Sequence, residues 1–302
     1  MSRSRPDLRA YALLGIVMLL WAGNSIVGRA VRFDIPPFFL AFVRWSGALI
    51  LILPFAIGSL KRDRAALFAG WKIVLAAGLA GVVAFNALLY TGLHHTSATN
   101  ALLLQAAIPA GVLLVDFLVF RTRASVGQIA GVLCSTCGVA AIVFRGDPQA
   151  VMGLAFGGGD VLILCAVVAW SFYTVFLRLK PAVAPESFLA ATFAIGVLGM
   201  APLAATEASQ IATMQWTPKV LGAFAYVAVL PSLIGYWLYN EAVTRIGAGR
   251  AGQTITLMPL FGALLSALLL NETLQGFHVV GMALILLGIG ITAFAMRRGT
   301  GM

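Results

Sequence analysis

Residues 98–138 read ATNALLLQAAIPAGVLLVDFLVFRTRASVGQIAGVLCSTCG, and about 150 residues later the chain repeats the pattern at 248–288 as AGRAGQTITLMPLFGALLSALLLNETLQGFHVVGMALILLG. Sliding the sequence by 150 positions brings identical residues together, among them Ala98 and Ala248, Ala101 and Ala251, Pro109 and Pro259, Leu114 and Leu264, Leu118 and Leu268, Gly131 and Gly281, and Gly138 and Gly288. Both copies keep a proline near the centre of an apolar segment. Such a proline is costly in a water-soluble helix, but in a membrane neighbouring helices satisfy the freed carbonyl. The sequence therefore predicts two related halves of one membrane fold.

The composition supports a membrane protein. Hydrophobic residues make up 61% of the 302 residues, charged residues only 10%, and the mean hydropathy is +0.99, which leaves too little polar surface to cover a soluble globule. A transmembrane helix needs about 20 apolar residues, and Gly, Pro and charged positions divide the chain into ten such stretches with short connections. The expected spans are 10–32, 37–58, 72–93, 97–119, 125–144, 159–179, 186–205, 220–243, 249–270 and 275–296. The predicted class is an all-α polytopic protein with ten transmembrane helices.

The distribution of positive charge predicts the orientation of these helices. If the N-terminus is cytoplasmic, fifteen Lys and Arg residues fall on inside segments, whereas only Arg29, Arg32, Arg145 and Lys219 fall outside and Arg44 lies within a span. Positive residues are retained on the cytoplasmic side of membranes. This asymmetry predicts two cytoplasmic termini and a multi-pass protein of the plasma membrane, here a bacterial inner membrane. It also accounts for the net charge of +10 without a nucleic-acid partner.

The duplication defines two units, a first repeat at 1–145 with helices 1–5 and a second repeat at 159–302 with helices 6–10, joined by a linker at 146–158. Upstream of the opening stretch the match continues with one residue of slip, because Trp21, Ser25 and Arg29 align with Trp170, Thr174 and Arg178. Five is an odd number, so the second unit enters the membrane from the opposite side. Such inverted repeats place a substrate site near the bilayer midplane, between the halves, and allow access to alternate by rocking.

Motifs in both halves resemble a known family. The first copy has Asn86-Ala87-Leu88-Leu89-Tyr90 followed by Ala98, Ala101, Pro109 and Gly131, and the second has Tyr236-Trp237-Leu238-Tyr239-Asn240 followed by Ala248, Ala251, Pro259, Asn271-Glu272, Gly281 and Gly288. Together they resemble the EamA repeat of the drug/metabolite transporter superfamily. The resemblance implies a ten-helix carrier that exports amino acids or related metabolites, with exporters of aromatic amino acids the most similar in character. The chain departs from the pattern at Thr122, where the second copy has the acidic Glu272.

Polar and aromatic residues inside spans are the candidates for substrate contact. Trp21, Asn24 and Ser25 share one face of the first helix, since they are spaced at i, i+3 and i+4. The full set of cavity candidates is Trp21, Asn24, Ser25, Asn86, Tyr90, Trp170, Tyr173, Thr174, Tyr236, Tyr239, Gln253 and Thr256. Aromatic rings and amides suit a small zwitterion with an apolar side chain. The alternative for each residue is plain helix packing or an interhelical hydrogen bond of about 1 kcal/mol.

Three residues in the spans have other candidate roles. Arg44 could attract a substrate carboxylate, because an ionisable group within a span is a functional-site hypothesis by default. It lies close enough to the end of its helix to snorkel, so a structural role stays open. Pro109 and Pro259 are expected to bend the helices around the cavity.

The same residues leave other functions open. An aromatic pocket also suits cationic drugs such as quaternary ammonium compounds, although no carboxylate is expected near the midplane, which disfavours both this function and a central proton relay. Facilitated or weakly coupled efflux is therefore preferred. A membrane-embedded enzyme would need a nucleophile with a base, or a metal cluster, and His94 and His95 have no second cluster beside them. No catalytic residue, metal or cofactor is expected, a non-transporting structural protein remains a further alternative, and the oligomeric state stays open.

Overall fold

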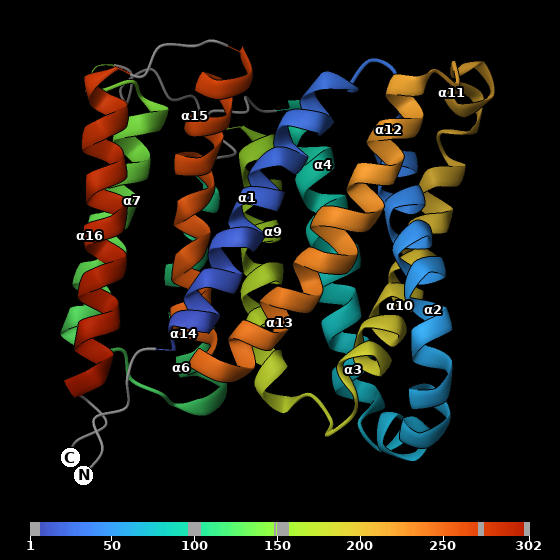
Figure 1. Ribbon diagram of the computed structural model, residues 1–302, viewed down its shortest axis with the longest axis horizontal. Helices are drawn as coiled ribbons and strands as arrows, with labels where there is room; N and C mark the ends of the chain where they lie inside the picture. Colours follow the sequence, from blue (N-terminus) through green and yellow to red (C-terminus); the bar gives the residue numbers. More distant parts are fainter. Residues whose placement is uncertain (1–6, 96–103, 148, 150–156, 271–274, 299–302) are drawn as a thin grey trace.

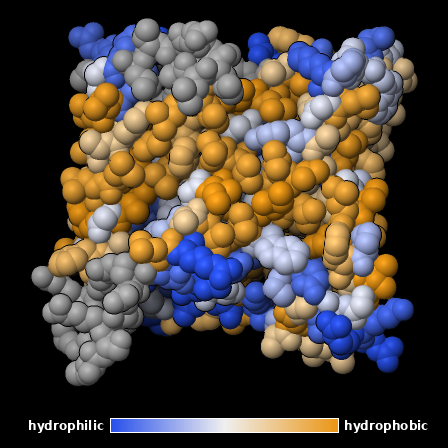
Figure 2. Space-filling model, in the orientation of Figure 1, coloured by the Kyte–Doolittle hydropathy of each residue, from blue (hydrophilic) through white to orange (hydrophobic). Residues whose placement is uncertain are grey.

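The computed structural model describes residues 7–95, 104–147, 149, 157–270 and 275–298. This part of the chain is a bundle of long helices in which α1 begins and α16 ends at the same end, the lower one in Figure 1. Eight of the described helical segments are long and apolar enough to cross a membrane. Figure 2 shows an apolar belt around the middle of the bundle, with hydrophilic residues gathered above and below it. The described part of the chain therefore has the surface of a multi-pass membrane protein.

The helices follow the expected spans closely. In the first half they are α1 (Leu8–Ala30), α2 (Pro37–Ala69), α3 (Trp71–Ala77), the π-helix η1 (Gly78–Ala84), α4 (Phe85–His95), α6 (Ile108–Phe120) and α7 (Val126–Val143). In the second half they are α9 (Gly158–Phe176), the 3₁₀ turn η2 (Leu177–Leu179), α10 (Pro185–Ala205), α11 (Ala208–Thr213), α12 (Pro218–Val227), the π-helix η3 (Ala228–Ile234), α13 (Gly235–Ile246), α14 (Ala248–Gln253), the 3₁₀ turn η4 (Thr254–Thr256), α15 (Leu257–Leu270) and α16 (Gly276–Arg298).

Several of the expected spans differ in the structure, among them 97–119, which a turn at Ala106–Ala107 interrupts. The helix expected at 37–58 continues to Ala69, because the charged stretch after Leu60 keeps helix-forming residues until Gly70 ends it. The span expected at 249–270 is divided into α14, η4 and α15. Most of the linker expected at 146–158 lies outside the described residues.

The two repeated prolines lie just after irregular turns of their helices. Pro109 is the second residue of α6, after a turn at Ala106–Ala107, and Pro259 is the third residue of α15, directly after η4. The first N–H groups of a helix have no intrahelical acceptor, so a proline there removes no hydrogen bond. Each proline therefore begins a new helical segment inside its apolar stretch.

Helices from the two halves pack in pairs, α7 on α16, α2 on α10, and α1 on α13. The pair α7 and α16 runs antiparallel, since Gly131 faces Gly288 while Gly138 faces Gly281. Glycine lets the two backbones approach closely. These pairs join the two halves along the full height of the bundle.

In the pair α2 and α10, each helix has a carboxylate near its C-terminal end that caps the N-terminus of the other helix. Glu207, which follows α10, accepts the backbone N–H groups of Phe38 (3.1 Å) and Phe39 (2.8 Å) at the start of α2. At the opposite end of the bundle Asp63 of α2 accepts the N–H of Ala184, the residue before α10, at 2.8 Å. A negative charge is favourable beside the unpaired N–H groups of a helix N-terminus. The two caps fix the register of α2 against α10.

Candidate functional site

Five aromatic side chains from three helices meet in the middle of the bundle. We call Trp21 of α1, Trp170 and Tyr173 of α9, and Tyr236 and Tyr239 of α13 the central aromatic cluster. The Trp21 ring lies 5.1 Å from that of Trp170 and 5.2 Å from that of Tyr239, and the rings of Trp170 and Tyr236 are 5.7 Å apart, measured between centroids. All five side chains are buried. These distances are those of aromatic rings in contact, so the cluster is closed in this conformation.

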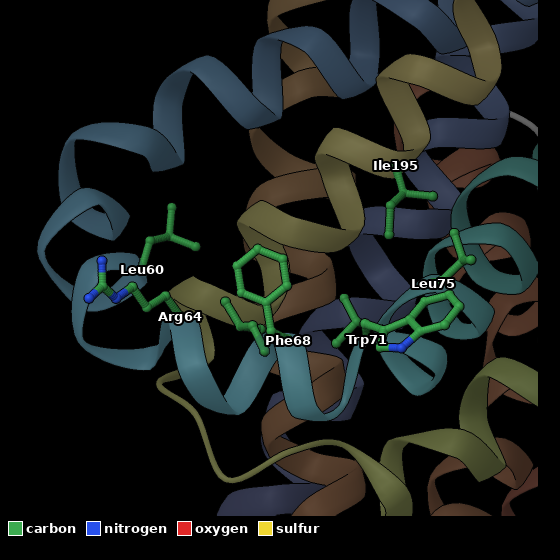
Figure 3. Close-up of a pocket in the computed structure, with 8 residues that line it drawn as sticks. Leu60, Arg64, Phe68, Trp71, Leu75 and Ile195 are labelled. Atoms are coloured by element: carbon green, nitrogen blue, oxygen red, sulfur yellow. The ribbon is translucent and has the colours of Figure 1, made fainter.

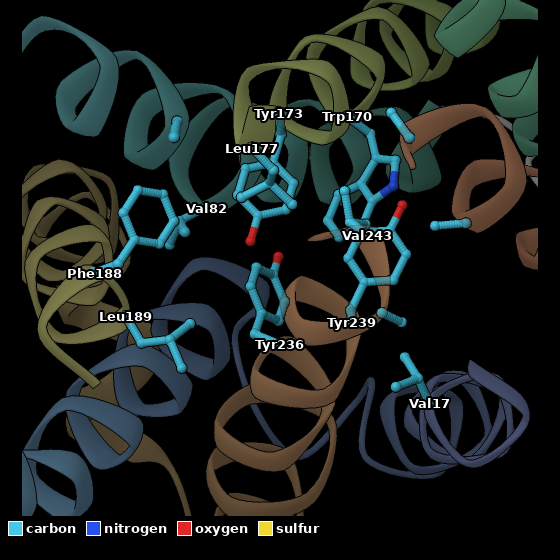
Figure 4. Close-up of a cluster of buried hydrophobic side chains, with 14 of the residues drawn as sticks. Val17, Val82, Trp170, Tyr173, Leu177, Phe188, Leu189, Tyr236, Tyr239 and Val243 are labelled. Atoms are coloured by element: carbon cyan, nitrogen blue, oxygen red, sulfur yellow. The ribbon is translucent and has the colours of Figure 1, made fainter. Parts of the chain in front are cut away.

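Helical spacing explains why these rings share one place. Trp170, Tyr173 and Thr174 recur at i, i+3 and i+4 on α9, and Tyr236 and Tyr239 recur at i and i+3 on α13, so each set forms one face of its helix. Figure 4 shows the two faces opposed, with the Tyr239 hydroxyl beside the indole nitrogen of Trp170. The structure thus brings together the aromatic candidates of the first, sixth and eighth expected spans.

The π-helix η3 supplies an acceptor to this cluster. Pro231 has no N–H to donate to the Val227 carbonyl four residues earlier, and the hydroxyl of Ser232 donates to that carbonyl instead, at 2.6 Å. One turn later the Gly235 N–H donates to the Leu230 carbonyl and not to the Pro231 carbonyl, which would accept it in an α-helix. The Trp21 Nε1–H donates to the Pro231 carbonyl at 2.9 Å. A side chain of the first half therefore bonds to a carbonyl in an irregular turn of the second half.

The first half contains the counterpart of this contact. The π-helix η1 lies 150 positions before η3, and Gly81 lies 150 positions before Pro231. The Gly81 carbonyl accepts a hydrogen bond of 2.8 Å from the Tyr236 hydroxyl. Asn86 is held by its own helix, since its Nδ2–H donates to the Val82 carbonyl at 2.7 Å. Each half thus receives an aromatic donor from the other at the matching position.

Hydroxyl and amide groups line one side of the cluster. The Tyr173 hydroxyl donates to Asn240 Oδ1 at 2.6 Å, and Thr174 Oγ1 lies 3.0 Å from the Tyr239 hydroxyl. The Nδ2 group of Asn240 is buried and has no hydrogen-bond partner among the described residues. A buried N–H group without a partner is costly, so the Nδ2 of Asn240 is an unsatisfied hydrogen-bond donor beside the cluster.

Arg44 is buried next to the cluster. Its side chain is 5% exposed, so it does not snorkel out of the bundle. Its Nε–H donates to the hydroxyl of Ser232 in η3, and its guanidinium lies 4.8 Å from the ring centroid of Trp45. Trp45 in turn packs on Tyr236, with the ring centroids 5.0 Å apart. No acidic residue of the described chain forms an ion pair with Arg44.

The remaining predicted residues have other hydrogen-bond partners or are only half-buried. Gln253 donates to the Gly288 carbonyl at 2.9 Å, and the Thr256 hydroxyl donates to the Gln253 carbonyl of its own turn at 2.8 Å. Tyr90 and Asn24 are half-buried. The side chain of Ser25 lies outside the part that the structure describes. Gln253 therefore ties α14 to α16 in this conformation.

Three aromatic residues extend the cluster beyond the sequence-based candidates. Phe85 packs on Trp170 at 4.8 Å, and Trp45 packs on Phe193 at 5.3 Å, measured between ring centroids. The indole nitrogen of Trp45 is buried without a hydrogen-bond partner among the described residues. One sequence signal was available, because Trp45 directly follows the embedded Arg44. Phe85 and Phe193 had none, since apolar residues fill all of these spans.

The described carboxylates lie in loops or toward helix ends. At the lower end of the bundle Arg245 bonds to Glu241, four residues earlier on α13, at 2.8 Å, and lies 3.6 Å from Asp7. Asp116 pairs with Arg178. Glu272 lies outside the described residues, as does the side chain of His94. In the described residues no group of three His, Cys, Asp or Glu side chains is placed to hold a metal ion.

Comparisons with known proteins found one matching family profile, several similar transporters and a solved structure of the same fold. The sequence profile of the EamA-like transporter family matches the chain twice, at residues 8–144 and 157–294. An "Uncharacterized transporter YetK" of Bacillus subtilis is 24% identical over 97% of this chain and 89% of its own length. A "Probable amino-acid metabolite efflux pump" of Escherichia coli is 25% identical over 93% of this chain and 94% of its own length. A protein of known crystal structure shares the fold with a TM-score of 0.77, at 18% identity over 97% of this chain and 99% of that one.

Proposed function

Because this chain belongs to the EamA-like transporter family, we propose that it exports amino acids or similar small metabolites by alternating access around the central aromatic cluster. The family assignment makes the protein a multi-pass membrane transporter. The substrate class is the proposal, and the name of the Escherichia coli relative supports it.

The buried, acid-free environment of Arg44 carries this proposal. A guanidinium that is 5% exposed and has no ion-pair partner in the described chain keeps a strong demand for an anion. Arginine binds carboxylates with two parallel hydrogen bonds. Here its Nε is already bonded to Ser232, which leaves the terminal nitrogens to meet a substrate carboxylate.

The rings of the central aromatic cluster supply the second part of the site. Trp21, Trp170, Tyr236 and Tyr239 offer apolar faces for a substrate side chain and π-faces for an ammonium group. The unpartnered Nδ2 of Asn240 adds a hydrogen-bond donor. A small zwitterion with an apolar or aromatic side chain fits these groups best, and a lone cation is disfavoured by Arg44.

We further propose that the chain consists of two inverted repeats of five transmembrane helices, at 1–145 and 159–302, joined by a linker at 146–158. Two separate family matches support the division. Contacts between related positions support the inversion. Gly131 corresponds to Gly281 and Gly138 to Gly288, since each pair is 150 positions apart. In the structure Gly131 contacts Gly288 and Gly138 contacts Gly281, so the two related helices run antiparallel. Ten spans result when the α6 stretch and the divided α14–η4–α15 stretch are added to the eight candidate spans of the described residues. The excess of basic residues at the lower end supports cytoplasmic termini.

In this mechanism the two halves rock against each other and the cluster opens to one side at a time. The cross-bonds from Trp21 to Pro231 and from Tyr236 to Gly81 close the cluster between substrates. Discontinuous helices, which here include η1, η3 and the segments begun by Pro109 and Pro259, are the usual places where transporters bind and move. Since the described carboxylates lie toward helix ends, we propose facilitated or weakly coupled efflux rather than a central proton relay.

The test is counterflow of labelled L-phenylalanine in liposomes that contain the purified protein, with phenethylamine, which lacks the carboxylate, as competitor. Arg44→Gln is expected to lower phenylalanine counterflow at least about tenfold, because it removes a buried charge-assisted pair. Phenethylamine is expected to inhibit the remaining counterflow more strongly than in the unmodified protein, because this cation no longer meets a buried guanidinium. Arg123→Gln, an exposed charge at the lower end, is the matched control. Normal counterflow by Arg44→Gln would leave Arg44 a structural role only. Transport of quaternary ammonium compounds but of no amino acid would replace the proposal with drug export.

A further inference from the structure

An apolar groove lies on the outside of the bundle, and none of the five residues of the central aromatic cluster lines it. It has a volume of about 440 Å³ and is lined by residues of α2, α3 and α10, including Leu60, Arg64, Phe68, Trp71, Leu75 and Ile195. Figure 3 shows Phe68 in its middle, Leu60 and Arg64 on one side, and Trp71, Leu75 and Ile195 on the other. Phe68 is 77% exposed and Trp71 52% exposed. Since Ile195 belongs to α10, the groove joins elements of both halves.

The groove lies at the depth of the lipid headgroups. Trp71 and Lys72 begin α3 directly after Gly70, at the lower end of the bundle (Figure 1). Tryptophan is enriched at the membrane–water interface, and the Lys72 Nζ lies 6.0 Å from the Trp71 ring centroid. The apolar wall formed by Leu75 and Ile195 therefore faces acyl chains, while the end near Arg64 faces headgroups.

Positive charge surrounds the headgroup end of the groove. Arg64 lines the groove, and Lys61, Arg62 and Lys72, which are close to Arg64 along the chain, are exposed as well. Two carboxylates lie nearby, since Asp63 accepts the Ala184 N–H at 2.8 Å and Glu186 accepts the Ser59 hydroxyl at 2.5 Å, so the four basic side chains outnumber the acidic ones. The rim of the groove is thus cationic beside an apolar slot.

We propose that this groove binds an anionic phospholipid, with its phosphate at Arg64 and one acyl chain between Phe68 and Ile195. A zwitterionic lipid fills the slot equally well, but only a net negative headgroup gains from the basic rim, where each Lys or Arg strengthens binding about fivefold. The contact of η1 with α10 is tight beside the groove, since a Cβ on Gly78, the first residue of η1, would lie 2.9 Å from Ile195. A lipid held across these helices stabilises their present arrangement.

Trp71 itself provides the readout. The full chain in mild detergent is titrated with phosphatidylglycerol or phosphatidylcholine that carries bromine on the acyl chains, which quenches tryptophan fluorescence on contact. Subtracting the signal of Trp71→Phe isolates the contribution of Trp71 from those of the other five tryptophans. Brominated phosphatidylglycerol is expected to reach half-maximal quenching at a concentration about fivefold lower than phosphatidylcholine, and inorganic phosphate is not expected to displace it.

Arg64→Gln is expected to remove most of this preference, while Arg123→Gln, another exposed arginine at the lower end but outside the groove, is expected to keep it. Arg64 is exposed, so its substitution leaves the fold intact, and equal unfolding temperatures in lipid-free detergent verify this. Equal quenching by the two lipids would overturn the proposal, and so would an unchanged preference in Arg64→Gln. Neither result depends on what the protein transports.

Discussion

Trp21 and Pro231 are 210 residues apart in the chain, yet the indole N–H of one donates to the carbonyl of the other at 2.9 Å. The carbonyl is available because Pro231 lies in a π-helix whose Gly235 N–H bonds elsewhere. The matching carbonyl of the first half, that of Gly81, accepts the Tyr236 hydroxyl. A backbone irregularity in each half is therefore completed by an aromatic side chain of the other half.

Replacing the indole of Trp21 tests this contact directly. Trp21→Phe keeps an aromatic ring but leaves the buried Pro231 carbonyl without its donor, which is expected to lower the free energy of unfolding by about 1–3 kcal/mol. Thermal unfolding in detergent measures this, and Trp71→Phe, at an exposed position, is the control.

Trp21→Ala and Trp170→Ala are expected to impair transport without preventing membrane insertion. Full transport by both alanine variants would remove these residues from the site.

The Ser232 hydroxyl makes two hydrogen bonds, so its removal tests how η3 is stabilised and how Arg44 is held. Ser232→Ala removes the donor to the Val227 carbonyl and the acceptor for Arg44, so a loss of stability of about 1–3 kcal/mol is expected. Counterflow should fall with it, because Arg44 loses the bond that orients it. Ser209→Ala, at an exposed position of α11, is the control. If Ser232→Ala matched this control in both stability and counterflow, the hydroxyl would have no part in holding Arg44.

The glycine contacts between α7 and α16 give a prediction about packing. A Cβ on Gly138 would lie 2.6 Å from the Gly281 carbonyl oxygen and 2.8 Å from the Ile285 nitrogen, so Gly138→Ala must push two backbones apart. We expect a destabilisation of about 1–3 kcal/mol. Gly290→Ala is the matched control, because nothing lies within 4 Å of its added Cβ and alanine favours a helix by about 1 kcal/mol over glycine. Equal unfolding temperatures for the two variants would contradict the close approach.

Glu207 should stabilise α2 through its N-terminus. Glu207→Gln removes the charge that accepts the Phe38 and Phe39 N–H groups, at a site only 6% exposed, and is expected to cost about 1–2 kcal/mol of stability. Asp34→Asn is the control, since it removes an exposed ion pair with Lys219 that is worth about 0–1 kcal/mol. The free energies of unfolding of the two variants are compared by chemical or thermal unfolding at one pH. A larger loss of stability in Asp34→Asn than in Glu207→Gln would contradict a stabilising role of Glu207 at the N-terminus of α2.

Part of the candidate site could be read from helical spacing. Trp170, Tyr173 and Thr174 recur at i, i+3 and i+4, which places them on one face of a helix. Glu241 and Arg245 are four residues apart, which is the spacing of the ion pair that the structure shows. The partners of Gln253 could not be read in this way, because which neighbour an amide meets depends on the helix packed against it. The burial of Arg44 was undecidable for the same reason, since its distance from the helix end permits snorkelling and burial alike.

The sequence by itself determined the membrane class, the positions of most helices and the duplication, because hydropathy, helix breakers and repeated residues are properties of neighbouring positions along one chain. Tertiary structure alone decided that Pro109 and Pro259 begin new helical segments, that η1 and η3 present carbonyls to the opposite half, and that Trp45, Phe85 and Phe193 join the aromatic cluster. These features depend on contacts between helices far apart in sequence. In a chain whose spans are almost uniformly apolar, hydrophobicity specifies burial in the membrane but not which side chains meet there.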